Sequence, residues 1–148
     1  MGFSVFFGAP YIPTRRSWAN NALELVKLNK SDLVIDLGSG DGTILKLVAK
    51  AGASVIGYEI NPILYLISRV RTYKYDSRVK VYLKNYWTSK LPSKTTIVYV
   101  FGLERDAIRL ERYLKKQGIG GLKIITFGFK LPNQKVLKKT DGAYLYCL

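Results

Sequence analysis

The sequence predicts an α/β fold in which helices cover a mostly parallel β-sheet that finishes in a C-terminal antiparallel hairpin. Three observations favour this fold. Short apolar runs alternate with segments of helical periodicity along the chain. A glycine-rich turn joins the first apolar run to a helical pattern, and an Asp-Gly pair separates two short runs near the C-terminus. Alternating strands and helices build a parallel sheet, and the hairpin adds an antiparallel edge.

Five segments are expected to be strands. Residues 33–37 are apolar at nearly every position, as in a parallel strand covered on both faces. Residues 54–59 and 79–83 repeat this pattern, and residues 95–101 form the most β-prone run in the chain. Residues 122–127 form the fifth strand, which follows a glycine-rich break.

Helical periodicity predicts four helices between these strands. The first helix is expected over residues 17–28, with Ser17 as its N-cap and an apolar face of Trp18, Ala22, Leu25 and Val26. The second covers residues 43–51 and ends near Gly52, and the fourth covers residues 104–116. The third begins at Pro62, and its apolar positions are Ile63, Leu64, Leu66, Ile67 and Val70.

The two ends of the chain differ in character. Pro10 and Pro13 restrict their neighbourhood to extended conformations, so we expect residues 1–16 to form an extended N-terminal arm. Residues 135–137 and 143–148 are expected to pair through a turn at Asp141-Gly142. A length of 148 residues with 48% hydrophobic residues predicts one globular domain over residues 1–148.

The chain carries a large positive charge. It has 24 Lys and Arg against 10 Asp and Glu, which gives a net charge of +14. This excess favours nucleic acid, anionic membrane surfaces or acidic protein patches as partners, and it does not choose among them. Because the lysines are spread over several elements, a basic surface that only faces solvent is an equal alternative.

Residue usage excludes several kinds of site. The single Cys147 excludes an internal disulfide, and the absence of His removes the usual zinc ligand and the usual near-neutral general base. The apolar start of the chain is far shorter than the roughly 20 residues needed to span a bilayer. We therefore expect a metal-free, cytoplasmic protein without a transmembrane segment.

The glycines between Gly38 and Gly42 predict a binding turn for a ligand. A P-loop is excluded because Thr43-Ile44 follows Gly42, where the phosphate-binding lysine would stand. The G-x-G-x-G spacing also differs from the G-x-G-x-x-G of a dinucleotide fold. Asp36, two residues before the first glycine, would repel a pyrophosphate and attract an ammonium group.

S-adenosylmethionine carries an ammonium group of this kind on its methionine end. Its product after methyl transfer is S-adenosylhomocysteine. Glu59 ends the second predicted strand, where a carboxylate can accept hydrogen bonds from both ribose hydroxyls. Asn85 follows the third strand and could bond the adenine edge, with Tyr86 or Trp87 beside the ring. The alternative is an ordinary turn whose acids only cap the backbone.

These motifs resemble class I S-adenosylmethionine-dependent methyltransferases, which have a Rossmann-like sandwich fold. More narrowly, the chain is similar to the small archaeal protein-lysine methyltransferases and their mitochondrial relatives that modify the ATP synthase c-subunit. The resemblance rests on five segments that span nearly the whole chain: residues 9–14, 36–42, 57–62, 98–103 and 129–132.

The resemblance implies roles for particular residues. Thr14 and Asp36 would hold the methionine moiety, Gly38 and Gly40 would give it room, and Glu59 would hold the ribose. Asn61 belongs to the same cofactor-binding set, and Asn85 and Tyr86 would flank adenine. On the substrate side, the arm of residues 1–16 would lie over the active site, with Tyr11 and Phe101 as the catalytic residues that shape the opening for a lysine.

The resemblance implies an archaeal type of enzyme that methylates exposed lysines of protein substrates, and we expect it to be a monomer. The first alternative is an RNA or DNA methyltransferase that uses the basic surface to contact nucleic acid. Amino-methylating enzymes of that class place Asn/Asp-Pro-Pro-Tyr/Phe/Trp after the fourth strand, where this chain has Phe101-Gly102-Leu103. The second alternative is a module that binds the cofactor without catalysis.

Overall fold

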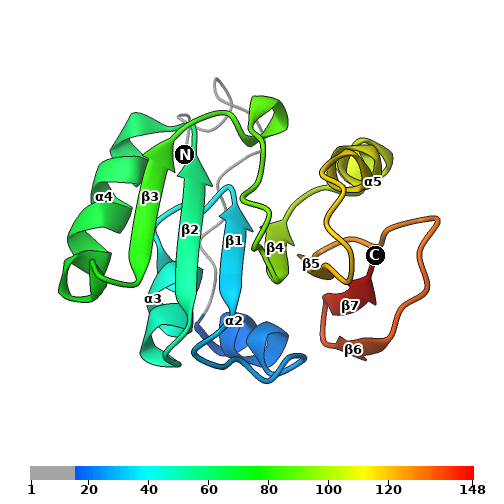
Figure 1. Cartoon of the computed structure of the whole chain (residues 1–148), viewed down its shortest axis with the longest axis horizontal. Coiled ribbons are helices and arrows are strands. Elements are labelled where there is room, and N and C mark those ends of the chain that lie inside the picture. The colour runs from blue at the N-terminus through cyan, green and yellow to red at the C-terminus, as the bar shows by residue number, and fades with distance from the viewer. Residues whose placement is uncertain (1–15) are drawn as a thin grey trace.

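Seven strands form one sheet in the computed structural model, which describes residues 16–148. Their order in the sheet is β3-β2-β1-β4-β5-β7-β6 (Figure 1). Neighbours from β3 to β5 pair in parallel, and β7 pairs antiparallel with both β5 and β6. The predicted α/β fold with a C-terminal antiparallel hairpin is confirmed. The bounds are β1 Leu33–Leu37, β2 Ser54–Glu59, β3 Val79–Leu83, β4 Ile97–Phe101, β5 Lys123–Phe127, β6 Lys138–Thr140 and β7 Ala143–Cys147.

Helices cover both faces of this sheet and leave two apolar layers between helix and strand. On one face, α2 (Arg16–Leu23) and α3 (Thr43–Lys50) pack over buried strand residues such as Val34 and Ile125. On the other face, α5 (Ala107–Lys116) packs over residues such as Ile35 and Ile124. In Figure 1, α4 (Pro62–Thr72) lies at the β3 end of the molecule and α5 lies toward the opposite end.

The first helix is shorter than predicted. It ends at Leu23, although Leu25 and Val26 beyond it are still buried in the core. Their backbone N–H groups bond to the carbonyls three residues before them, which is the tightened geometry that closes a helix. Ser17 is not the N-cap, because the helix already includes Arg16, and the expected arm therefore ends no later than residue 15. Residues 1–15 lie outside the described residues.

Other element boundaries also shift. The fourth strand begins at Ile97 instead of residue 95. The hydroxyl of Thr96, just before it, accepts the Leu33 N–H and donates to the Asp32 carboxylate. A short 3₁₀ turn, Glu104–Asp106, precedes α5 and takes the place of its predicted first turn. The Asp141-Gly142 turn is confirmed, but its first strand is Lys138–Thr140 and not residues 135–137.

The burial of α4 differs most from expectation. Of its five predicted apolar positions, only Leu64 is buried. The inner face of α4 instead carries Ser68 and Thr72, whose hydroxyls bond to carbonyls of the preceding turn. The side chains on this inner face are small because α4 lies very close to the glycine turn. A Cβ added at Gly42 would lie only 3.0 Å from the Cβ of Ser68. None of the helices in residues 16–148 is long and apolar enough to cross a membrane.

Candidate functional site

The glycine turn lies at the carboxyl end of β1, between the sheet and the start of α3. Gly38, Gly40 and Gly42 all have positive φ angles, of 79°, 56° and 87°, which other residues adopt only with strain. The N–H groups of Gly38 and Ser39 donate to the carbonyl of Tyr58, at 2.9 and 3.0 Å, and so fix the turn against β2. Gly38 is exposed, and a Cβ there would meet no atom within 4 Å, so this side of the turn is open to a ligand.

Glu59 connects the glycine turn to the start of α4. One carboxylate oxygen accepts the Gly40 N–H at 2.7 Å, and the other accepts the Asn61 N–H at 2.9 Å. Asn61 in turn caps α4, because its Oδ1 accepts the N–H groups of Ile63 and Leu64. Each Glu59 oxygen keeps a further lone pair for another donor. Glu59 therefore holds the turn and can still bind a ligand.

Asp36 is a buried carboxylate that has no partner in the described part of the chain. It is 2% exposed, and within residues 16–148 it accepts no hydrogen bond and forms no ion pair. Burial raises the pKa of the Asp36 carboxyl well above its ordinary value, and the charges of Glu59 and Asp41 raise it further. A buried, unpaired carboxylate costs several kcal/mol, so the site is suited to a cationic group that would offset this cost.

Three further polar atoms near this turn are buried and unpaired among the described residues: Ser39 Oγ, Asn61 Nδ2 and the Tyr99 hydroxyl. Tyr99 of β4 lies directly opposite Asp36 of β1 in the strand register. Burial raises the pKa of the Tyr99 hydroxyl, and the neighbouring Asp36 charge raises it further. Unsatisfied buried polar groups are rare in native proteins, and their concentration here indicates a ligand site.

Three aromatic rings lie on the same face of the sheet as Asp36 and Tyr99. Phe101 stacks on Phe127 at 5.4 Å between ring centroids, and Phe127 stacks on Trp18 at 5.7 Å. Phe101 was predicted for the site, and the structure places it at the carboxyl end of β4, two residues after Tyr99. Sequence reasoning missed Tyr99, Trp18 and Phe127. The only available signal for Phe127 was its position at the end of a predicted strand.

Asn85 and Tyr86 follow β3, next to Glu59. The Lys84 N–H bonds to the Glu59 carbonyl at 3.0 Å, which brings this segment beside β2. The exposed Asn85 accepts the Trp87 N–H through its side chain, at 3.0 Å. Tyr86 packs on the Trp87 ring at 4.8 Å, and burial raises the pKa of its hydroxyl to about 12. Their contact with adenine stays a prediction.

The other predicted site residues divide into two groups. Gly38, Gly40, Glu59 and Asn61 are brought together around the glycine turn and the start of α4. Tyr11 and Thr14 lie outside the described residues. Within residues 16–148, no group of three or more Cys, Asp or Glu side chains could hold a metal ion.

Comparison with known proteins matches the chain to one family and to several relatives. Residues 36–138 match the family model described as the ANTKMT methyltransferase domain. The chain is 30% identical over 126 residues to the ATP synthase c-subunit lysine N-methyltransferase of Xenopus laevis, covering 84% of this chain and 55% of that protein. It is 28% identical over 151 residues to a protein-lysine N-methyltransferase of Saccharolobus islandicus, covering 94% and 93% of the two chains.

Among solved structures, the chain is similar to an RNA methyltransferase from Salinibacter ruber in complex with S-adenosyl-L-homocysteine. The TM-score is 0.83 at 25% identity, with 92% of each chain covered. The chain spans about half the length of the ATP synthase c-subunit lysine N-methyltransferases that it matches. It spans nearly the whole length of the archaeal relative.

Proposed function

Because the chain belongs to the ANTKMT methyltransferase domain family, we propose that it is an S-adenosylmethionine-dependent methyltransferase acting on protein lysine side chains. The observation that carries the cofactor assignment is Asp36, a buried carboxylate beside the glycine turn that has no partner within residues 16–148. The acceptor assignment rests on the archaeal relative, which this chain matches over nearly its whole length and which is a protein-lysine N-methyltransferase.

The residues around the turn fit the charge of this cofactor. S-adenosylmethionine supplies a sulfonium-bound methyl group, and its methionine end carries an ammonium group. Asp36 and Glu59 place two carboxylates beside the glycine turn, although the chain as a whole is strongly basic, and the nearby charge of Asp41 is offset by its ion pair with Arg71. This local negative potential favours a cationic ligand and disfavours a diphosphate. We assign the ammonium group to Asp36, with Thr14 as a second contact for the methionine end.

The residues proposed for the remaining cofactor contacts lie at or just after the carboxyl ends of neighbouring strands. The free lone pairs of Glu59 can accept hydrogen bonds from ribose hydroxyls, because its two oxygens are already oriented by backbone donors. A Cβ at Gly38 would meet no atom within 4 Å, and we propose that Gly38 and Gly40 give room to the methionine moiety. Asn61, beside them, has an amide nitrogen that is unpaired among the described residues. We assign the adenine environment to Asn85 and Tyr86, which follow the neighbouring strand.

Methyl transfer to lysine requires a neutral amine, alignment and the exclusion of water. The stacked rings of Phe101, Phe127 and Trp18 give one apolar wall on the Asp36 face of the sheet. A lysine amine entering such surroundings has a lowered pKa, because burial disfavours its charged form. We propose that Tyr11 orients this amine through its hydroxyl and that Phe101 shapes the opening. No histidine is needed for direct displacement of this kind.

We also propose that the enzyme is a cytoplasmic monomer of archaeal type. Support for the archaeal assignment is the sequence similarity to the Saccharolobus islandicus relative, at 28% identity over 151 residues. Support for a reducing compartment is the single, exposed Cys147. Residues 1–15 would form the arm over the active site.

A second candidate function is methylation of RNA. Two observations favour it: the similarity to the Salinibacter ruber RNA methyltransferase and the net charge of +14. Single-stranded nucleic acid is bound by basic grooves together with exposed aromatic rings. Digestion of the labelled product distinguishes a protein-lysine acceptor from an RNA acceptor.

The test is incubation of the purified protein with methyl-labelled S-adenosylmethionine and a cell extract, followed by digestion with nuclease or with protease. Protein-lysine methylation predicts that the label resists nuclease, is released by protease and is recovered as methyl-lysine after hydrolysis. Release of the label by nuclease alone would assign the enzyme to RNA or DNA. In Asp36→Asn we expect label transfer to fall with cofactor affinity.

A further inference from the structure

The outer face of α4 is apolar, whereas its inner face is partly polar. Exposed fractions are 46% for Ile63, 60% for Leu66, 41% for Ile67, 77% for Val70 and 75% for Tyr73, which directly follows α4. These five residues, here called the α4 outer stripe, follow one another at intervals of one or three positions. They therefore form one continuous band along the helix. Among the described residues, no element buries this band.

This arrangement is the reverse of an ordinary surface helix, in which the apolar side faces the core. The sheet side of α4 carries Leu64, Ser68 and Thr72, all buried. The hydroxyls of Ser68 and Thr72 are satisfied by carbonyls of α4 itself, at 2.8 Å in both cases. A folded protein that exposes its large aliphatic side chains as a contiguous band has a binding surface there.

Basic residues border the α4 outer stripe. At 100° per residue, Arg69 lies on one side of the stripe and Arg71 on the other, and Lys74 follows at the end of the helix. All three are exposed. Arg69 bonds to Tyr65 of its own helix, so that it extends along the helix surface.

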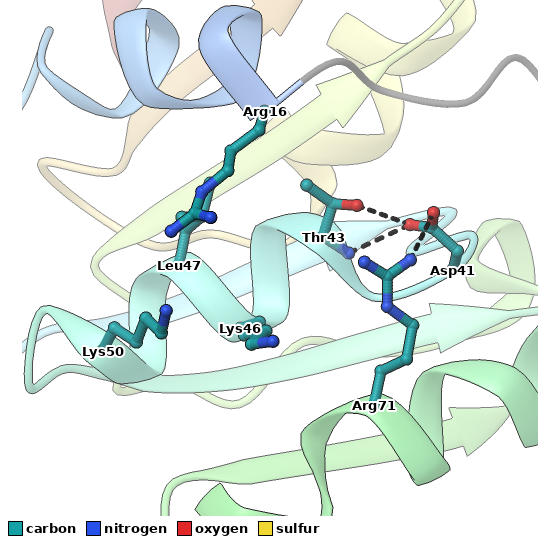
Figure 2. Close-up of a pocket in the computed structure, with 7 residues that line it drawn as sticks. All are labelled: Arg16, Asp41, Thr43, Lys46, Leu47, Lys50 and Arg71. Atoms are coloured by element: carbon teal, nitrogen blue, oxygen red, sulfur yellow. Dashed lines mark hydrogen bonds and ion pairs between the residues drawn. The ribbon is translucent and has the colours of Figure 1, made fainter.

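The basic character continues from α4 across α3 to α2. A groove between these helices is lined by Arg16, Lys46, Lys50 and Arg71, together with Asp41, Thr43 and Leu47 (Figure 2). Asp41 and Arg71 form an ion pair at 2.8 Å, which is the one ion pair between side chains of residues 16–148. Four cations against one carboxylate leave this groove positively charged.

From the apolar stripe and its basic surroundings, we propose that the α4 face docks on an anionic membrane surface. Aliphatic and aromatic side chains inserted between lipid headgroups, with Lys and Arg around them, are the features of an interfacial helix. A phosphate backbone alone would use the basic groove but not the aliphatic stripe. A second copy of the chain would bring the Arg69, Arg71 and Lys74 side chains of both copies together, at a cost in like-charge repulsion.

Vesicle sedimentation tests this docking directly, without cofactor or substrate, and therefore independently of the proposed methyl transfer. The protein is mixed with vesicles of phosphatidylcholine alone or with about one third phosphatidylserine. We expect binding to the mixed vesicles, at least about tenfold weaker binding to the neutral ones, and loss of binding in high salt. Failure to bind the mixed vesicles at about 0.15 M salt would overturn the proposal.

The double variant Leu66→Gln/Val70→Gln tests whether the stripe is the contact. Both side chains are exposed, so thermal unfolding should match the unaltered protein while vesicle affinity falls at least about tenfold. The matched control is Ile108→Gln, which changes a 53% exposed residue on α5. Unchanged vesicle affinity in the double variant would overturn the assignment to this face.

A tryptophan reporter then locates the insertion. In Tyr73→Trp, addition of anionic vesicles should shift the emission to shorter wavelength, and the same addition should leave Ile108→Trp unchanged. Sedimentation velocity without lipid completes the test. A dimer that the double variant abolishes, together with no vesicle binding, would assign the α4 face to a second copy and contradict membrane docking. Pull-down of an acidic protein without vesicle binding would contradict it equally.

Discussion

Replacing Asp36 by Asn should weaken the binding of the cofactor and stabilise the cofactor-free protein. The change removes the charge of a 2% exposed carboxylate that has no partner in the described part of the chain, and it nearly preserves the side-chain shape. The free protein loses the cost of a buried charge. The complex loses the attraction between that charge and the cofactor's ammonium group. One substitution thus moves folding stability and cofactor affinity in opposite directions.

The size of both effects follows from the site. A hydrogen bond to a charged group contributes about 1.5–3 kcal/mol, which corresponds to about 10- to 150-fold in the dissociation constant. The buried amide of Asn is itself unsatisfied, so only part of the charge cost is recovered. We expect a net gain of roughly 1 kcal/mol in the free energy of unfolding, or about 3 °C in Tm for a domain of this size.

The pH dependence has a definite sign. The pKa of Asp36 is higher in the folded protein than in the unfolded chain, because burial disfavours its charged form. Asp36 therefore costs no stability below its ordinary pKa of 3.8, and it costs progressively more as pH rises to its folded pKa. The stability advantage of Asp36→Asn should grow over that window. Cofactor affinity of the unaltered protein should fall as pH drops below the folded pKa, and that of Asp36→Asn should stay nearly constant.

Isothermal titration with S-adenosylhomocysteine and thermal unfolding measure both quantities on the same samples. Asp76→Asn is the matched control, because it removes the same charge from an exposed residue after α4. Both quantities should change by less than about 0.5 kcal/mol in the control. An unaltered dissociation constant in Asp36→Asn, or a Tm that falls by several degrees at neutral pH, would refute this account of Asp36.

Three further predictions concern other positions. Gly57→Ala should destabilise the protein by about 1–3 kcal/mol in denaturant titration, because the new Cβ would lie 2.7 Å from the Cβ of Ser39. Gly120→Ala is the control and should be nearly neutral, because no atom lies within 4 Å of its new Cβ. Tyr99→Phe should raise the Tm of the free protein by removing a buried, unpaired hydroxyl, and a lowered Tm would show that this hydroxyl has a partner. Tyr11→Phe should reduce turnover by at least about tenfold while calorimetric cofactor affinity stays the same; a loss of affinity instead would contradict its role in orienting the amine.

The sheet and the glycine turn could be predicted from the sequence because their signals are local. The run from Leu33 to Leu37 is apolar except for Asp36, and the glycines after it require backbone conformations that other residues avoid. The hairpin was predictable for the same reason, since Asp141-Gly142 specifies a turn. Only the first strand of the hairpin differs, at Lys138–Thr140 instead of residues 135–137, because its pairing with β7 places Thr140 opposite Ala143 across the turn.

Features that depend on tertiary contacts could not be predicted. Tyr99 is opposite Asp36 only because β1 and β4 are neighbours in a particular register, and no spacing in the sequence gives that register. The orientation of α4 is decided by the close approach of Gly42 to Ser68, which overrides the larger apolar stripe on the other side of the helix. The same stripe that periodicity assigns to the core therefore faces outward.

We propose that this chain transfers methyl groups from S-adenosylmethionine to lysine side chains of proteins. Tandem mass spectrometry of a protein extract incubated with the enzyme and isotopically labelled cofactor tests it most directly. We expect labelled methyl groups on lysine Nζ atoms, and strong loss of this labelling with Asp36→Asn but not with Asp76→Asn. Peptides free of labelled lysine, with the label recovered in nucleosides instead, would contradict it.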